Sequence, residues 1–325
     1  MQFKDKKSLR IVFLGTPDFA VESLNRLYEG GYNIVGVITM PDKKGGRGNK
    51  IIESAVKQYA VAHNLPLLQP ENLKDDSFIN ELRGWKADLQ IVIAFRMLPQ
   101  VVWSMPPLGT FNLHASLLPK YRGAAPINRA VMNGEKETGV TTFLLKHEID
   151  TGDIIQQEAV PIENTDNVEM VHDKLMHLGA RLVIETVDSF IEGNVKPIPQ
   201  DKLLTAGVKP TSAPKIFKDD CRIDWTASVL SVYNHIRGLS PYPAAWSTFV
   251  DESGNVTQFK IFETGLPQQS STEAIPGTVK ITKHTLAICC SDGELEIKSI
   301  QIAGKKRMSA DELLRGFNLT GKHCL

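Results

Sequence analysis

The chain has 325 residues, of which 42% are hydrophobic and 23% charged, with 37 basic and 37 acidic side chains. This length suits two domains better than a single core, and the composition is that of an ordinary globular protein. A formal net charge of zero excludes a protein coated uniformly in basic charge, although local basic patches are still possible.

The sequence predicts a reduced, cytoplasmic protein with no membrane partner. No two of the four cysteines have C-x-x-C spacing, which favours free thiols. Pro17 and Asp18 interrupt the first apolar run too early for a signal peptide. No stretch approaches the roughly 18 apolar residues that span a bilayer.

In the first part of the chain, expected strands alternate with expected helices. The strands are expected at 9–14, 34–39, 89–95, 110–113, 139–146 and 154–160. Thr16 is expected to cap a first helix with Pro17 at its first position, and a second helical stripe is expected to start at Ile51 after a polar loop over 40–50. This alternation predicts an α/β domain with an open, Rossmann-like, mostly parallel sheet.

A long amphipathic helix is expected to begin near Val168 and to end near Gly193. We therefore expect a first domain over 1–193. Four prolines in 194–220 are expected to break any regular element, so this segment is predicted to be a linker.

The remainder, 221–325, is predicted to be a C-terminal, OB-like β-barrel domain. It has a helical segment at 228–236, followed by short strands at barrel-like spacing. Those strands are expected at 246–250, 256–262, 277–281, 285–290 and 295–302. Ser309 and Glu312 form a capping-box pattern that should open a last short helix.

The turn after the first strand argues against a dinucleotide oxidoreductase. A dinucleotide-binding fold places G-x-G-x-x-G there, but this chain has only Gly15 of the three glycines. Pro17 also lacks the backbone N–H that a pyrophosphate would use. The turn is therefore interpreted as an ordinary connection from strand to helix, and the alternative is a turn that lines the rim of an active site.

Asn112 and His114 lie where a parallel strand ends, which is the edge at which ligands bind in open α/β sheets. Being two residues apart on an extended segment, they should project to the same face and could meet one carbonyl oxygen. Either residue alone would more often be a structural hydrogen-bonder. The pairing, and the acidic loop at Asp150, favour a functional site.

Asp150 begins the sequence Asp-Thr-Gly-Asp between two predicted strands. The segment is either an ordinary hairpin turn or a catalytic loop in which Asp150 would bond His114, directly or through water. An amide, an imidazole and a carboxylate are the groups needed to move a formyl group between two amines. Two of them would stabilise the oxyanion, and one would transfer protons.

Two basic clusters could hold a polyanion. The first comprises Lys43, Lys44, Arg47 and Lys50, and the second comprises Lys305, Lys306 and Arg307. Each alone would usually be a solvated face, whereas two together fit a nucleic acid. The remaining histidines show no metal-binding spacing, so no metal site is predicted.

With these residues, the chain resembles the methionyl-tRNA formyltransferases, a family of 10-formyltetrahydrofolate-dependent enzymes, over essentially its whole length. The segments that carry the resemblance are 13–20, 112–119, 122–126, 137–141, 149–153 and 303–306. The Asn-x-His plus Asp pattern is common to formyltransferases that use this folate, and the C-terminal stretch points to tRNA. The chain departs from the family at Phe95-Arg96, where Tyr-Gly is more usual.

The resemblance implies the following site residues. The catalytic set is Asn112, His114 and Asp150. The folate site is lined by Ser116, Leu117, Leu118 and Pro119, and by the backbone around Ala94, Phe95, Arg96, Met97 and Leu98. The tRNA contacts come from both basic clusters, with the 40–50 loop reaching the acceptor arm.

The resemblance also implies the reaction. The formyl group of the co-substrate 10-formyltetrahydrofolate passes to the α-amine of methionyl initiator tRNA, which gives N-formylmethionyl-tRNA for translation initiation. The amine attacks directly, Asn112 and His114 stabilise the oxyanion, and Asp150 handles the protons. No metal takes part, and the enzyme is expected to be a monomer.

Two alternatives stay open on the sequence. The same chemistry could act on glycinamide ribonucleotide or an amino-sugar nucleotide, although a single α/β domain would suffice for those acceptors. The protein could instead be a non-catalytic RNA-binding protein. A separation of more than about 8 Å among the three candidate catalytic side chains would favour that second alternative.

Overall fold

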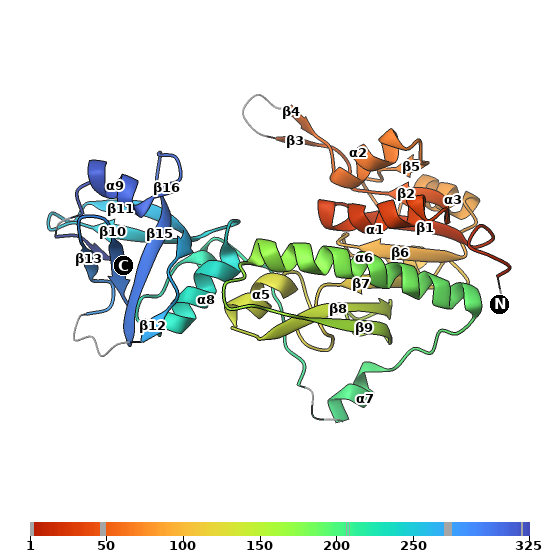
Figure 1. The fold of residues 1–325 in the computed structure, drawn as a ribbon. Coiled ribbons are helices and arrows are strands. Elements are labelled where there is room, and N and C mark those ends of the chain that lie inside the picture. Colours follow the sequence, from red (N-terminus) through yellow and green to blue (C-terminus); the bar gives the residue numbers. More distant parts are fainter. Residues whose placement is uncertain (1–2, 46–49, 206, 208, 270–274, 320) are drawn as a thin grey trace. The chain divides into compact units, whose positions relative to one another are not determined.

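The computed structural model describes residues 3–45, 50–205, 207, 209–269, 275–319 and 321–325 (Figure 1). The chain forms two compact units whose segments interleave along the sequence. Unit 1 comprises 1–123, 138–160 and 172–212, and unit 2 comprises 124–137, 161–171 and 213–325. The domain boundaries expected from the sequence stay a prediction.

Unit 1 is built on a seven-stranded sheet with the strand order β5-β2-β1-β6-β7-β8-β9. From β5 to β7 neighbouring strands run parallel, and β7 pairs antiparallel with β8. The strands are β1 Arg10–Gly15, β2 Asn33–Ile38, β5 Leu67–Leu68, β6 Leu89–Ile93, β7 Thr110–His114, β8 Glu137–Leu144 and β9 Ile154–Pro161. The predicted mostly parallel α/β sheet is confirmed.

Helices cover both faces of this sheet. On one face, α6 packs on β7 and β8, where Phe190 stacks on Phe111 with 6.1 Å between ring centroids. On the other face, α3 and α4 share an apolar cluster with Val12, Leu14 and Val92. The helices of this unit are α1 Asp18–Glu29, α2 Ala55–Ala62, α3 Asp76–Gly84, α4 Gln100–Trp103, α6 Val168–Glu192 (mainly) and α7 Gln200–Thr205.

Three local predictions near the N-terminus are wrong. Pro17, rather than Thr16, is the N-cap of α1. The expected loop over 40–50 contains strands β3 (Lys43–Gly45) and β4 (Lys50–Ile52), which pair as an antiparallel hairpin. The second helix begins only after Ser54, whose hydroxyl caps it. The β-branched isoleucines before Ser54 favour the strand over the helix.

The segment 194–220 is more regular than its prolines predict. It contains helix α7 and a short 3-10 helix, Asp219–Cys221. Pro199 immediately precedes α7, where a proline removes no helical hydrogen bond. Ile198 also makes a reciprocal backbone pair with Ile154 at the start of β9. The segment up to 212 therefore belongs to unit 1.

Unit 2 is an antiparallel, β-rich domain, as predicted for the C-terminal part of the chain. Its main path has the order β13-β14-β15-β11-β10-β17, and β12 and β16 pair with β15. The strands are β10 Ala245–Val250, β11 Val256–Thr264, β12 Gln268–Gln269, β13 Val279–Ile281, β14 Leu286–Cys289, β15 Gly293–Ile302, β16 Met308–Ser309 and β17 His323–Cys324. Its helices are α5 Pro126–Met132, α8 Val229–Leu239 and α9 Ala310–Gly316.

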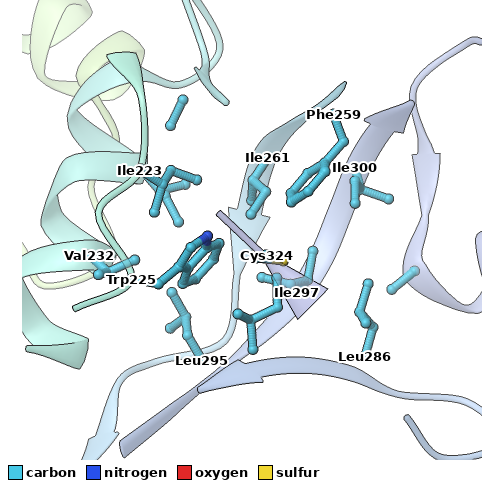
Figure 2. Close-up of a cluster of buried hydrophobic side chains, with 14 of the residues drawn as sticks. Ile223, Trp225, Val232, Phe259, Ile261, Leu286, Leu295, Ile297, Ile300 and Cys324 are labelled. Atoms are coloured by element: carbon cyan, nitrogen blue, oxygen red, sulfur yellow. The ribbon is translucent and has the colours of Figure 1, made fainter. Parts of the chain in front are cut away.

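The core of unit 2 is one cluster of buried apolar side chains (Figure 2). Trp225 belongs to this cluster, and its indole N–H donates to the Ser247 hydroxyl at 2.9 Å, so its polar atom is satisfied inside the core. At the N-terminus of α9, Ser309 and Glu312 form the reciprocal bonds of a capping box, which confirms that prediction.

Candidate active site

Strand β7 presents two polar side chains to one face of the unit 1 sheet. Phe111 and Leu113 point to the opposite face, where α6 packs; the space beside Gly179 of α6 is filled by Leu113. Because side chains alternate along a strand, Asn112 and His114 share the face that α6 does not cover.

The orientation of the His114 ring is set by a backbone carbonyl. The ring is 7% exposed, and its Nε2 lies 2.8 Å from the Tyr121 carbonyl oxygen. A carbonyl oxygen can only accept a hydrogen bond, so Nε2 carries a hydrogen and donates it. The other ring nitrogen, Nδ1, therefore faces Asp150.

Asp150 is held close to His114 without a direct hydrogen bond between them. The distance from Asp150 Oδ2 to His114 Nδ1 is 3.8 Å, which suits an ion pair but is too long for a hydrogen bond. Of the two expected arrangements, the direct bond is therefore wrong, and a bond through water stays a prediction. The same Oδ2 accepts the Gly123 backbone N–H at 2.8 Å.

Asn112 lies between Val92 of β6 and Phe143 of β8 in the sheet, and its side chain is half-buried. Within the described part of the chain, no group forms a hydrogen bond with the side-chain amide of Asn112. Its N–H donors are therefore available to a bound molecule. The structure thus places Asn112 and His114 on one face, and Asp150 beside His114.

The turn that carries Asp150 lies tightly against the end of β8. A Cβ built on Gly152 would stand 1.6 Å from the Leu144 carbonyl oxygen, so only glycine fits there. Asp150 itself has φ +55°, in the left-handed region that aspartate tolerates better than most residues.

Replacing Gly152 with alanine should lower the free energy of unfolding by about 1–3 kcal/mol, because the backbone must move to admit the methyl group. Urea denaturation would measure the loss. Gly84→Ala is the matched control, since a Cβ there meets nothing within 4 Å, and we expect no destabilisation. Equal stability of the two variants would contradict the close approach.

The loop 116–119, expected at the folate site, is anchored by β8. Thr141 accepts the Leu118 backbone N–H at 3.2 Å and donates to the Ser116 carbonyl oxygen at 2.6 Å. Ser116, Leu118 and Pro119 are buried, whereas Leu117 is partly exposed. A ligand at this loop would therefore meet its backbone and Leu117 rather than the other three side chains.

The second expected folate segment, 94–98, follows β6. Ala94 has φ +47°, and its side chain and that of Met97 are exposed. Phe95 and Leu98 pack into the apolar cluster under α3 and α4. The guanidinium of Arg96, the departure from the family pattern, donates to the carbonyl oxygens of residues 70 and 71.

The two basic clusters lie in different units. In unit 1, Lys43 and Lys44 are exposed on β3 and Lys50 begins β4, while Arg47 lies outside the described residues. In unit 2, the second cluster, Lys305, Lys306 and Arg307, is exposed, and the Arg307 guanidinium lies 4.5 Å from the Phe262 ring centroid. Within the described residues, no group of three or more His, Cys, Asp or Glu side chains could hold a metal ion.

Nothing in the sequence signals Gln200, which is 2% exposed and lies at the start of α7. Its amide donates to the carbonyl oxygens of Asp150 and Gly152 at 2.9 and 2.8 Å. The contact joins positions about fifty residues apart, and no local pattern of residues indicates such a bond.

None of the helices in the described ranges has the length and apolar character needed to cross a bilayer.

Known proteins resemble the chain along nearly its whole length. Residues 9–187 match the formyl transferase family model, and 215–318 match that of the formyl transferase C-terminal domain. The methionyl-tRNA formyltransferase of Bacteroides fragilis is 64% identical over 97% of both chains. That of Parabacteroides distasonis is 56% identical over 96% of this chain and 97% of its own. That of Porphyromonas gingivalis is 47% identical over 97% of this chain and 98% of its own.

Solved structures share the fold at lower identity. HypX from Aquifex aeolicus in complex with tetrahydrofolic acid aligns with a TM-score of 0.62 and 20% identity, over 94% of this chain and 47% of that one. WlaRD, a sugar 3N-formyl transferase, aligns with a TM-score of 0.62 and 19% sequence identity, over 92% of this chain and 99% of that one. Given both family models and 64% identity to a curated relative, the chain belongs to the methionyl-tRNA formyltransferase family of enzymes.

Proposed function

We propose that the protein transfers the formyl group of 10-formyltetrahydrofolate to the α-amine of methionine carried by initiator tRNA. The observation that carries the proposal is the 3.8 Å approach of Asp150 Oδ2 to His114 Nδ1, on the strand that also presents Asn112. Relatives named for this reaction, up to 64% identical, support the choice of acceptor.

The first step is attack of the amine on the formyl carbon. A C–N bond forms, and the carbonyl oxygen becomes an oxyanion that needs hydrogen-bond donors. The Asn112 amide is one donor. Because Nε2 of His114 already donates to Tyr121, the ring can offer a second N–H only from Nδ1, and only as the imidazolium. The Asp150 carboxylate supplies the opposite charge to that cation.

The second step moves one proton and breaks one bond. The attacking amine gives up a proton to Asp150 through water, and the tetrahedral intermediate then expels N10 of the folate. That nitrogen takes the proton back from Asp150, so the carboxylate ends the cycle unchanged. The oxyanion is met by protein donors, and we therefore propose no metal in this chemistry.

The substrates meet the protein at the loops expected from the family. We assign the folate co-substrate to 94–98 and 116–119. We assign the tRNA phosphates to the two basic clusters, Lys43, Lys44, Arg47, Lys50 and Lys305, Lys306, Arg307. In this proposal, 1–193 is the catalytic domain, 194–220 the linker and 221–325 the tRNA-binding domain of a cytoplasmic monomer that binds no membrane.

Transfer of a labelled formyl group tests the proposal directly. Labelled 10-formyltetrahydrofolate is mixed with enzyme and one of three acceptors: charged initiator tRNA, glycinamide ribonucleotide or an amino-sugar nucleotide. We expect label on the tRNA alone, because the chain carries a second unit with its own basic cluster. Transfer to either small acceptor instead would overturn the proposed substrate. Binding of tRNA without any transfer would favour the non-catalytic alternative.

A further inference from the structure

Gln200 joins the two loops that hold the His114–Asp150 pair. One loop is the turn of Asp150 and Gly152, whose carbonyl oxygens accept both N–H groups of the Gln200 amide, at 2.9 and 2.8 Å. The other loop contains Arg122, whose guanidinium donates to Gln200 Oε1 from Nη2 at 2.5 Å and from Nε at 3.2 Å.

The loop on the Arg122 side is the one that orients both reacting groups. Tyr121 provides the carbonyl oxygen that fixes His114, and Gly123 provides the N–H that binds Asp150 Oδ2. Arg122 stands between them in the chain. The carbonyl oxygens facing one end of the Gln200 amide and the guanidinium facing the other leave only one orientation for its oxygen and nitrogen.

The Asp150 turn requires such support. Asp150 has φ +55°, a conformation that costs free energy and persists only when its surroundings fix it. Gln200 is 2% exposed, so a turn without it would lose two hydrogen bonds at a site shielded from water. Small displacements of a proton-transferring group lower the rate strongly.

We propose that Gln200 is a positioning residue for catalysis: by bonding the Asp150 and Gly152 carbonyls and Arg122 together, it holds the Asp150 carboxylate at its working distance from His114. This rests on the proposed role of Asp150 in proton transfer. Gln200 itself touches neither substrate nor reacting atoms, and it acts through the turn.

The test compares two Gln200 variants with the parent enzyme. Gln200→Met keeps the length of the side chain but removes all its hydrogen bonds, and it should lower kcat about 10- to 100-fold while both KM values change about two-fold at most. Gln200→Glu keeps an acceptor for Arg122 but places oxygen against two carbonyl oxygens, and kcat should fall at least as far. Formyl transfer to charged initiator tRNA measures both.

Gln156→Met is the matched control. Gln156 lies in the same unit, where its amide accepts a hydrogen bond from Thr186 of α6 at 2.9 Å and donates one to Ser189 of α6 at 3.4 Å. Its variant should keep the kcat of the parent. An equal fall in kcat for Gln156→Met, or an unchanged kcat in Gln200→Glu, would overturn the positioning role. If Gln200→Met does not fold, Gln200→Glu decides alone, because it keeps the Arg122 contact.

Asp150→Asn separates this inference from the function on which it rests. An inactive Asp150→Asn enzyme together with Gln200 variants of unchanged kcat would contradict the positioning role of Gln200 and leave the proposed role of Asp150 intact. An active Asp150→Asn enzyme would remove Asp150 from proton transfer, and the positioning role would fall with it.

Discussion

Replacing Asp150 with asparagine should lower kcat about 10²- to 10⁴-fold, because the variant can no longer accept the proton of the attacking amine or return one to N10. The shape of the side chain is kept, and its amide oxygen can still accept the Gly123 N–H. KM values and the melting temperature should therefore change little. Steady-state formyl transfer and thermal unfolding measure the two effects.

Asp153 provides the control for this substitution. It ends the same four-residue turn, but its carboxylate pairs with Lys146 at 2.7 Å rather than with His114. Asp153→Asn should retain nearly the parent rate. If both variants lose activity equally, the effect comes from the charge of the turn as a whole, and the specific role of Asp150 is wrong.

Replacing His114 with alanine should lower kcat about 10²- to 10³-fold, the usual loss when one oxyanion donor is removed. The loops proposed to bind folate and tRNA are held by other residues, so both KM values should change far less than kcat. Single-turnover transfer with enzyme in excess isolates the chemical step from product release.

His114→Gln separates the two nitrogens of the ring. A glutamine can offer one N–H to the Tyr121 carbonyl oxygen, but it carries no positive charge to face Asp150. It should therefore remain as slow as the alanine variant. Recovery of the parent rate would contradict a role for Nδ1 as a charged donor.

His177 provides the control for the His114 variants. It is 60% exposed on α6, and replacing it with alanine should not change the rate.

The sheet of unit 1 could be predicted from sequence because its central strands β1 and β6 are buried on both faces. Val12 and Phe13 lie in a short apolar run closed by Gly15, and such a run has few other structures open to it. The long helix α6 was equally well signalled, since its apolar stripe extends from Val168 into its last turns. The hairpin β3–β4 could not be predicted in this way, because its strands are short and their sequences do not alternate between apolar and polar residues.

The candidate catalytic residues could be predicted for a different reason. Asn112 and His114 stand two residues apart at the end of a recognisable strand, so their common face follows from the geometry of the strand alone. That Asp150 lies beside His114 needed the family pattern as well. The contact between the Asp150 turn and Gln200 could be predicted neither from strand geometry nor from the family pattern. A side-chain amide that binds two carbonyl oxygens distant in sequence produces no recognisable local pattern of residues.

The return of the chain to the Asp150 turn after α6 sets the minimum length of a working fragment. A protein cut after Gly193 would retain Asn112, His114 and Asp150, yet it would lack Gln200 and the Thr211 groups that accept the backbone N–H of Tyr121 and of Arg122. Every residue named in the chemistry would be present, but the Asp150 turn would lose both of its hydrogen bonds to Gln200. Truncations and domain exchanges in this enzyme should therefore keep the chain to at least Ser212.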